Sequence, residues 1–303
     1  MTTSMLEPRH FVPNGDVQLA VYQWGEDRAE RPKLLLVHGT GFCAPVWQSV
    51  AESLASEFVV YAIDRRGHGL SSKPEDAYHF LDFAEDLLAV IDRLGIEAAY
   101  GVGHSAGATD LLLATSQRPA AFRRIFAMEP TVMDPRERPE RAELSAERRE
   151  YLANVARRRT TFSSDEDVVR RYQARPAFIP WRPELLELYV QHGFEACADG
   201  SVRLRCVPQV ERAMLVHIFA AMDGSYRGDG RGNPFEILQE ISSPTCIATT
   251  DGSDDIYKEM AEIAATLVPC AQSFRFARVG HSVAQEQPDD VVSALRTFWG
   301  ASG

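Results

Sequence analysis

The segment 101–107 places a serine where it could act as a nucleophile. It reads Gly-Val-Gly-His-Ser-Ala-Gly, and its last five residues match G-x-S-x-G around Ser105. A strand-like stretch, 98–102, runs into it and a helical stretch, 109–115, follows it, which is the context of a nucleophile elbow. Such a turn also leaves backbone N–H groups at the start of a helix, where they can bind an anion. Nucleophilic catalysis by Ser105 is therefore predicted, provided that the chain supplies a base, an acid and an oxyanion hole.

A candidate general base lies near the end of the chain. His281 follows the strand-like stretch 273–279, and Gly280 ends that strand so that the imidazole lies at its carboxyl edge. Ligands bind at this edge in open α/β sheets, and we expect His281 to be the base. His38 and His104 stand beside turns, where we expect them to be structural hydrogen-bonding groups.

The loop after the first buried strand could complete an oxyanion hole. It reads His-Gly-Thr-Gly-Phe over residues 38–42. A backbone N–H of Thr40 or Gly41 could point to the same place as the N–H of Ala106, the residue after the serine. Two such donors would stabilise a tetrahedral oxyanion, and the loss of one costs on the order of 3 kcal/mol in enzymes where this was measured. Alternatively, the two glycines form an ordinary turn.

Two sites compete for the role of the acid. Glu129 ends the apolar stretch 124–128, and Asp254 and Asp255 lie in an acidic loop after a later strand. An acidic loop is normally solvated surface. A carboxylate that closes an apolar strand partly leaves water, which is costly without a partner, and a charged His281 would be such a partner. Glu129 is therefore favoured, with Asp254 or Asp255 as the alternative acid.

Short apolar runs that alternate with helical patterns must position these residues. The runs occupy 34–37, 58–63, 98–102, 124–128, 245–248 and 273–279. Continuous apolar strands alternating with amphipathic helices are typical of an α/β protein with a parallel sheet covered on both faces. Residues 10–24 alternate around Asn14-Gly15, which favours an antiparallel hairpin before this sheet.

The pattern changes between residues 131 and 239. This segment has helical periodicity and no convincing strand, with helices expected at 143–159, 165–174, 183–193 and 208–222. A helical insertion in one α/β domain explains this better than two successive domains. We expect a core domain of residues 1–130 and 240–303 and a cap of residues 131–239. Ring-bearing residues of the loops and cap could line a substrate pocket or pack in the core: Phe42, His104, Phe178, Trp181, Tyr189 and Phe219.

Composition limits the classes of partner. Of the 303 residues 45% are hydrophobic and 25% charged, ordinary values for a globular protein. The net charge of −11 argues against nucleic acid and anionic membranes, and no apolar run approaches the ~18 residues that span a bilayer. No signal peptide is visible, and five cysteines without a CxxC pair favour free thiols in a reducing cytoplasm. We expect a cytoplasmic protein with a small-molecule substrate, and the oligomeric state stays open.

Together these motifs resemble the α/β-hydrolase family. The resemblance rests on His38-Gly39, on Asp-Arg-Arg-Gly-His-Gly-Leu-Ser at 64–71, on the G-x-S-x-G elbow and on Gly280-His281. It implies an eight-stranded, mostly parallel sheet with helices on both faces. It also implies a helical cap inserted between strands six and seven.

The resemblance also bears on the acid. Family members usually place an Asp after strand seven, in a Gly-x-x-Asp turn. The segment from Gly252 to Asp255 fits the spacing of that turn. However, the usual distance of the Asp from the strand would place it near Ser253. Haloalkane dehalogenases and the lactonases that open zearalenone are similar to this chain in having Glu after strand six, where Glu129 stands. The family pattern thus leaves both sites open and favours Glu129.

The expected chemistry is acyl transfer. His281 would take the proton of Ser105 as it attacks a carbonyl, and would then activate water to release the acyl-enzyme. We predict a serine hydrolase that cleaves an ester, lactone or similar carbonyl group of small, mostly apolar molecules, with no metal or organic cofactor. A C–C bond hydrolase or a hydroxynitrile-lyase-like enzyme would use the same site. A third possibility is a small-molecule receptor with weak turnover. A fourth is a dinucleotide-binding protein, since residues 101–106 also fit the dinucleotide-binding pattern G-x-G-x-x-A.

Overall fold

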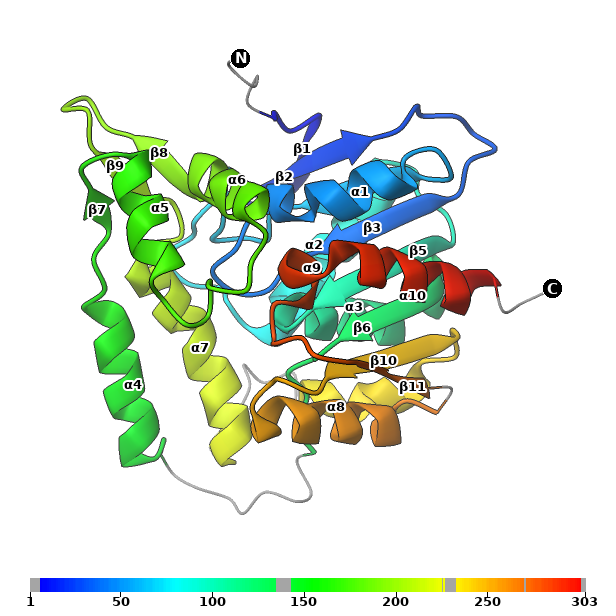
Figure 1. Cartoon of the computed structure of the whole chain (residues 1–303). Coiled ribbons are helices and arrows are strands. Elements are labelled where there is room, and N and C mark those ends of the chain that lie inside the picture. Colours follow the sequence, from blue (N-terminus) through cyan, green and yellow to red (C-terminus); the bar gives the residue numbers. More distant parts are fainter. Residues whose placement is uncertain (1–5, 135–142, 225, 227–232, 270, 301–303) are drawn as a thin grey trace.

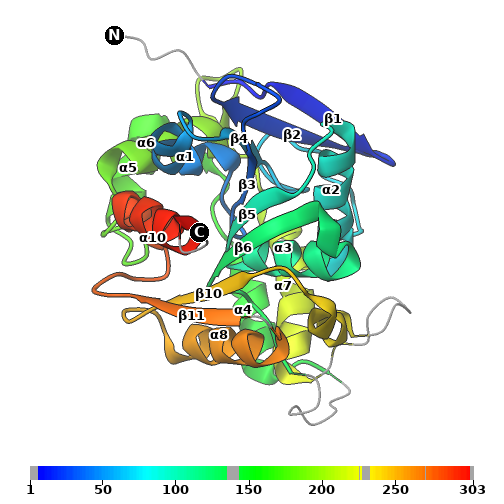
Figure 2. The same ribbon diagram turned by 90° about the vertical axis from the view of Figure 1, so that its right-hand side faces the viewer.

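The centre of the molecule is an eight-stranded sheet (Figures 1 and 2). The computed structural model describes residues 6–134, 143–224, 226, 233–269 and 271–300. In sheet order the strands are β1 (His10–Asn14), β2 (Val17–Trp24), β4 (Val59–Ile63), β3 (Lys33–Val37), β5 (Ala99–His104), β6 (Phe122–Met128), β10 (Thr245–Thr250) and β11 (Ala271–Phe276). β2 pairs antiparallel with β1 and β4, and all the other pairs are parallel. The predicted mostly parallel α/β sheet is confirmed.

Helices cover both faces of the sheet, because its inner strands are apolar along most of their length and must be buried on both sides. α2 (Phe80–Arg93), α3 (Ala106–Gln117) and α8 (Asp255–Leu267) pack on one face, and α1 (Gln48–Leu54) and α10 (Pro288–Gly300) on the other (Figure 2). A short helix, α9 (Val283–Glu286), precedes α10. Two apolar clusters result, one on each side of the sheet.

Between β6 and β10, the described residues form four α-helices and a second, small sheet. The helices are α4 (Ala146–Ala156), α5 (Asp165–Gln173), α6 (Pro183–Gly193) and α7 (Pro208–Asp223). The sheet pairs β7 (Thr161–Phe162), β9 (Val202–Leu204) and β8 (Phe194–Ala196) antiparallel. The prediction that this segment lacks strands is therefore wrong. Its strands are two or three residues long, too short for an alternating pattern to be recognised. The 3-10 helix Pro234–Glu240 leads back to the sheet.

The carboxyl ends of β3, β5, β6 and β10 meet at one edge of the sheet. Val37 is opposite Gly103, and Met128 is opposite both His104 and Ala248. The loops after these strands, which hold the predicted nucleophile, acid and oxyanion loop, therefore open side by side. This register brings segments far apart in the sequence to one place, as is usual for ligand sites in open α/β sheets.

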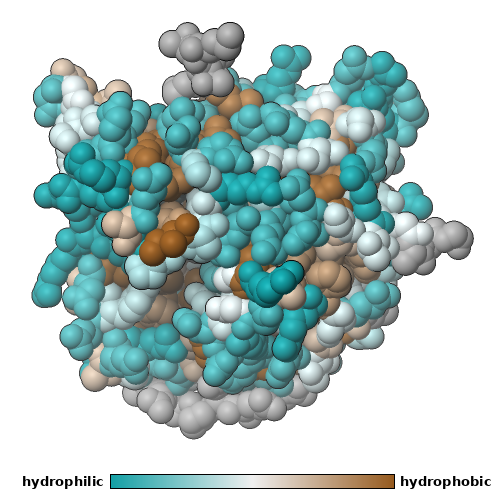
Figure 3. Space-filling view, viewed as in Figure 1, coloured by the Kyte–Doolittle hydropathy of each residue, from teal (hydrophilic) through white to brown (hydrophobic). Residues whose placement is uncertain are grey.

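The surface offers scattered apolar residues. The exposed large hydrophobic side chains of the described chain are Phe11, Leu70, Tyr151, Ile179 and Phe274, and the face in Figure 3 is mainly hydrophilic with small apolar patches. None of the described helices is long and apolar enough to cross a membrane. Four of the five cysteines are free thiols, and the fifth, Cys270, lies outside the described residues.

Candidate active site

Ser105 lies in a strained turn between β5 and α3. Its backbone has φ 54° and ψ −126°, and a positive φ costs a non-glycine residue roughly 1–3 kcal/mol. The turn is tightly enclosed. A Cβ at Gly107 would lie 2.4 Å from the carbonyl oxygen of His38, and one at Gly103 would lie 2.6 Å from Cα of Ala108. The observed turn thus has the strand–turn–helix form of a nucleophile elbow, with glycine where no side chain fits.

Glu129 and His281 form a short contact beside this turn. Nδ1–H of His281 donates to Oε2 of Glu129 over 2.5 Å, and Glu129 is fully buried. The N–H and hydroxyl of Thr250 lie 3.0 Å from Oε1, and the hydroxyl of Ser253 lies 2.7 Å from Oε2. Burial raises the pKa of the Glu129 carboxyl, but the hydrogen bond and charge of His281 and the bond from Ser253 outweigh it and hold the pKa below its usual range. Glu129 is therefore an ionised partner for the imidazole.

The two aspartates predicted as the alternative acid lie elsewhere. Asp254 is the exposed N-cap of α8 and lines the cavity described below. Asp255 is fully exposed, and its Oδ1 lies 3.2 Å from Nζ of Lys258. Within the described part of the chain, neither carboxylate forms a hydrogen bond with His281. The structure brings Glu129, and not these aspartates, to the imidazole.

Packing on its faces holds the His281 ring. Tyr257 stacks on it with ring centroids 3.9 Å apart and planes 23° apart, and the His104 ring lies at 4.7 Å. Nε2–H of His104 donates to the carbonyl of His281 over 2.8 Å. Burial and the nearby charge of His281 lower the pKa of His104 to about 3, so His104 is a neutral donor. The N–H of Gly280 donates to Oε2 of Glu286 over 2.8 Å and fixes the preceding turn.

The loop after β3 lies against Ser105, but one of its two predicted oxyanion donors is already used. A Cβ at Gly39 would lie 3.1 Å from Cβ of Ser105. The N–H of Gly41 donates to Nε2 of His68 over 2.9 Å, so Gly41 as an oxyanion donor is a wrong prediction. In the described chain the N–H groups of Thr40 and Ala106 donate to no protein acceptor, as expected for Ala106 at the first position of a helix.

Two neutral histidines hold this loop. Nδ1–H of His38 donates to the carbonyl of Gly39 over 2.8 Å, while Nε2 accepts from the N–H of Arg65 at 3.1 Å. Nδ1–H of His68 donates to the carbonyl of Arg66 over 3.0 Å and leaves Nε2 to accept from Gly41. Burial lowers the pKa of His38 to about 3 and that of His68 well below its usual value. Each ring therefore stays neutral and links the loops after β3 and β4.

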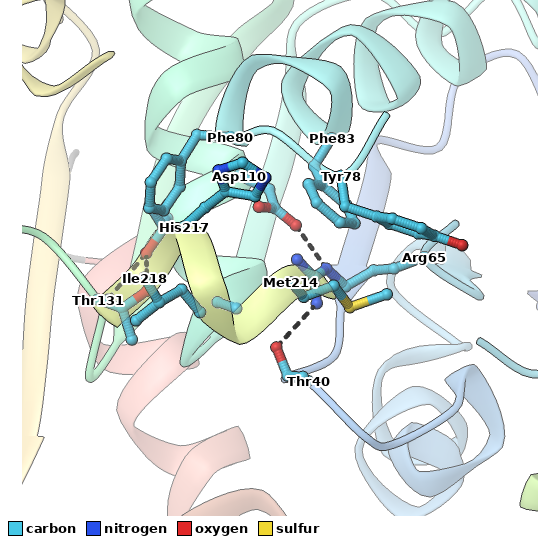
Figure 4. A pocket seen from close by; sticks show the side chains of 12 residues that line it. Thr40, Arg65, Tyr78, Phe80, Phe83, Asp110, Thr131, Met214, His217 and Ile218 are labelled. Atoms are coloured by element: carbon cyan, nitrogen blue, oxygen red, sulfur yellow. Dashed lines mark hydrogen bonds and ion pairs between the residues drawn. The ribbon is translucent and has the colours of Figure 1, made fainter. Parts of the chain in front are cut away.

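A buried ion pair lies behind Thr40 (Figure 4). Nε of Arg65 donates to Oδ2 of Asp110 over 2.5 Å, and each side chain is 3% exposed. Nη1 of Arg65 lies 3.4 Å from the hydroxyl of Thr40. Because Arg65 follows β4 and Asp110 belongs to α3, the pair ties the loop after β4 to the helix that begins at Ala106, and Arg65 also reaches Thr40 of the loop after β3.

Ser105 and His281 line one cavity of about 380 Å³. Its other walls come from the core loops, α4, α7 and α8: Gly39, Thr40, Phe42, His104, Thr131, Arg148, Tyr151, Glu211, Leu215, Ile218, Phe219, Met222, Asp254, Ile256, Tyr257 and Met260. Of the predicted pocket residues, Phe42, His104 and Phe219 are present. Apart from Phe219, sequence reasoning did not assign the residues of α4, α7 and α8 to the pocket, because periodicity does not tell which neighbour a helix face meets.

Of the two alternatives predicted for Phe178, Trp181 and Tyr189, the structure shows core packing, and these residues are not among those that line this cavity. They pack with one another and with Phe42, whose ring lies 5.1 Å from that of Trp181 and 5.9 Å from that of Tyr189. The Tyr189 hydroxyl donates to the carbonyl of Gly41 over 3.1 Å. These aromatics therefore form a core behind Phe42 and support the loop after β3.

A sequence model of the alpha/beta hydrolase family matches residues 34–294. The chain belongs to the α/β hydrolase family. Curated α/β hydrolases match over shorter stretches. The 2-(acetamidomethylene)succinate hydrolase of Mesorhizobium japonicum is 34% identical over 103 residues, which are 34% of this chain and 37% of that protein. The N-formylmaleamate deformylase of Pseudomonas putida is 36% identical over 103 residues, 34% and 38% of the two chains. The matches thus span less than two fifths of these relatives.

Solved structures of α/β hydrolases share the fold over nearly the whole chain. E-2-(acetamidomethylene)succinate hydrolase superposes with a TM-score of 0.74 at 22% identity and covers 96% of this chain and 100% of that one. The thioesterase domain from the curacin biosynthetic pathway gives a TM-score of 0.74 at 22% identity, over 94% and 98% of the two chains. At these identities the likeness shows the α/β hydrolase fold alone.

Proposed function

We propose that this α/β hydrolase cleaves a carboxylic ester or lactone of a small molecule through an acyl-enzyme on Ser105. The contact between the buried Glu129 and His281, whose ring lines the same cavity as Ser105, carries the proposal. A serine on a strained turn, an oriented imidazole and a buried ionised carboxylate are the parts that acyl transfer requires.

Acylation follows from this arrangement. Since Nδ1–H of His281 is bound to Glu129, Nε2 is the nitrogen that takes the proton of Ser105. The serine oxygen bonds to the carbonyl carbon, and the oxyanion accepts hydrogen bonds from the N–H groups of Ala106 and Thr40. When the intermediate collapses, the C–O bond to the leaving group breaks and His281 gives that group its proton.

Deacylation repeats these steps with water. His281 takes a proton from water as the water oxygen attacks the acyl carbon, and it returns a proton to Ser105 when the ester bond breaks. The products are a carboxylic acid and an alcohol, or a hydroxy acid from a lactone. Glu129 keeps its negative charge throughout and stabilises the charged imidazole.

A fluorophosphonate probe tests the proposal at its first step. We expect one adduct, which mass spectrometry places on Ser105, and no adduct on Ser105→Ala. 4-Nitrophenyl esters of increasing chain length, a lactone and a vinylogous diketone then distinguish ester, lactone and C–C bond cleavage. A native protein that the probe does not label would rule out the proposed mechanism, and turnover of the diketone alone would favour C–C hydrolysis.

We also propose that residues 131–239 act as a cap over a core of residues 1–130 and 240–303. The support is that α4 and α7 supply one wall of the cavity, while the core supplies the serine, the acid and the base. The apolar part of that wall, which includes Leu215, Ile218 and Phe219, suits a mostly apolar substrate.

A further inference from the structure

Arg148 places a cation in the wall of the reaction cavity. It belongs to α4, and its side chain is 29% exposed. Among the described residues that line this cavity, no other is a lysine or an arginine. The proposed acyl-transfer mechanism does not use this guanidinium. We therefore consider a role for it in substrate binding.

Neighbours on α7 hold the guanidinium in one orientation. Its Cζ lies 4.7 Å from the centre of the Phe219 ring, and its Nε lies 3.6 Å from Oδ1 of Asp223. Asp223 also accepts a hydrogen bond of 2.8 Å from the N–H of Ser145, the N-cap of α4. The carboxylate thus ties the start of α4 to the end of α7, and the guanidinium is fixed between them.

The outer nitrogens of Arg148 remain available. Within the described part of the chain, Nη1 and Nη2 of Arg148 donate to no protein acceptor. An arginine presents five N–H donors in a planar fork that matches the two oxygens of a carboxylate. A fixed guanidinium with unused outer nitrogens is therefore suited to bind a carboxylate group.

The acidic groups around the cavity leave Arg148 as the favourable place for an anion. Glu211 is paired with Arg158, whose Nη1 lies 2.6 Å from its Oε1. Asp254 is exposed to water at the start of α8, which screens its charge. The contact of Asp223 with Arg148 is at Nε, over 3.6 Å.

One tyrosine of the same cavity wall contacts the proposed base. Tyr257 stacks on the His281 ring at 3.9 Å between centroids. Arg148 and Tyr257 line the same cavity of about 380 Å³ as Ser105. A substrate whose carbonyl reaches Ser105 therefore shares this cavity with the guanidinium.

We propose that Arg148 binds a carboxylate of the substrate, so that the enzyme prefers esters or lactones with a negative charge a few bonds from the reacting carbonyl. This inference rests on the proposed function and narrows its substrate class.

Two esters of equal chain length measure the preference. Mono(4-nitrophenyl) adipate ends in a carboxylate, whereas 4-nitrophenyl hexanoate ends in a methyl group. We expect the ratio of their kcat/KM values, charged over neutral, to fall at least tenfold in Arg148→Gln. Arg148→Lys should keep part of the ratio, because it retains the charge but not the planar fork. Arg149→Gln is the matched control, since Arg149 is the next residue of α4 and its side chain is 55% exposed outside the cavity wall.

Binding of adipate itself, measured by isothermal titration, separates this inference from the proposed function. We expect adipate to bind the native protein and Arg149→Gln, and to bind Arg148→Gln at least tenfold more weakly. If neither ester is hydrolysed but this pattern of binding holds, the proposed function fails and the carboxylate site stands. Equal ester ratios in the native protein and Arg148→Gln, or adipate binding that Arg148→Gln does not weaken, would overturn the inference.

Discussion

The carboxylate of Glu129 and the imidazole of His281 meet at 2.5 Å, although 152 residues separate them in the chain. Glu129 follows β6 and His281 follows β11, and β10 lies between these strands in the sheet. The Glu129 side chain therefore reaches past the end of β10, where Thr250 and Ser253 donate hydrogen bonds to it. The loop after β10, where family members usually place the acid, here supplies donors to a carboxylate from the neighbouring strand.

Replacing Glu129 by Gln should reduce kcat by about four orders of magnitude. The amide keeps the size of the side chain but loses the charge that stabilises protonated His281. Its NH₂ group can donate to Nδ1, which favours the tautomer with the proton on Nε2, and that tautomer cannot accept the proton of Ser105. Steady-state kinetics on the best 4-nitrophenyl ester would measure the loss. Asp255→Asn is the control and should keep native kinetics. An inactive Asp255→Asn beside an active Glu129→Gln would reassign the acid.

Local sequence patterns sufficed to predict the sheet and to single out the proposed nucleophile and the proposed base. Ser105 follows a strand and has a glycine two residues away on each side, and His281 follows Gly280, so a few nearby residues carry each signal. Glu129 could be favoured because a carboxylate at the end of an apolar strand needs a partner. The availability of the Gly41 N–H could not be predicted, because it depends on His68 in another loop. The residues of α4, α7 and α8 that line the cavity likewise could not be predicted, because tertiary packing determines which face of each helix points to the cavity.

Stability should fall as the pH drops below about 6.5, because three buried histidines are neutral in the folded protein. The pKa values of His38 and His104 are lowered to about 3 and that of His68 lies well below its usual value, mainly through burial. An unfolded histidine titrates near pH 6.5. The unfolded chain thus binds more protons below that pH, and each histidine destabilises the fold by up to about 1.4 kcal/mol per pH unit.

Urea unfolding at pH 7.5, 6.5 and 5.5 would measure this dependence. The variant His104→Gln retains an N–H for the carbonyl of His281 but removes one titrating group. Its free energy of unfolding should therefore depend less steeply on pH than that of the native protein, by about one proton. A free energy of unfolding that stays constant from pH 7.5 to 5.5 would contradict the assignment of neutral histidines.

Gly107→Ala should destabilise the fold by about 3 kcal/mol or more. The added methyl group would lie 2.4 Å from the carbonyl oxygen of His38 and 2.6 Å from that of Val37, and neither backbone atom can move cheaply. Gly200→Ala is the comparison, because Gly200 has a φ of +83° but no atom within 4 Å of the added Cβ. It should cost about 1 kcal/mol from backbone strain alone. Equal midpoints of urea unfolding for the two variants would refute the close approach of α3 to β3.

Removing one member of the buried ion pair should cost more than removing both. Asp110→Ala leaves the guanidinium of Arg65 buried without its partner, at a cost of about 3–5 kcal/mol. The double variant Arg65→Leu/Asp110→Ala removes the unpaired charge, so its loss should be smaller than that of Asp110→Ala alone, and therefore smaller than the sum of the two single losses. Chemical denaturation of all four proteins completes the cycle. Additive losses would show that the two side chains act independently.

Tyr257→Leu should lower kcat, whereas Tyr257→Phe should keep it within about threefold. The stacked ring restricts rotation of the His281 imidazole about its bond to Glu129, and an aromatic face attracts the charged imidazolium by about 0.5–1 kcal/mol. Phenylalanine preserves both effects, and leucine fills much of the space but supplies neither. Because both effects act on the proposed base and not on the bound substrate, the loss should fall on kcat and leave KM little changed. A rise in KM at constant kcat would instead assign Tyr257 to substrate binding, and equal effects of the two substitutions would assign the effect to the hydroxyl group.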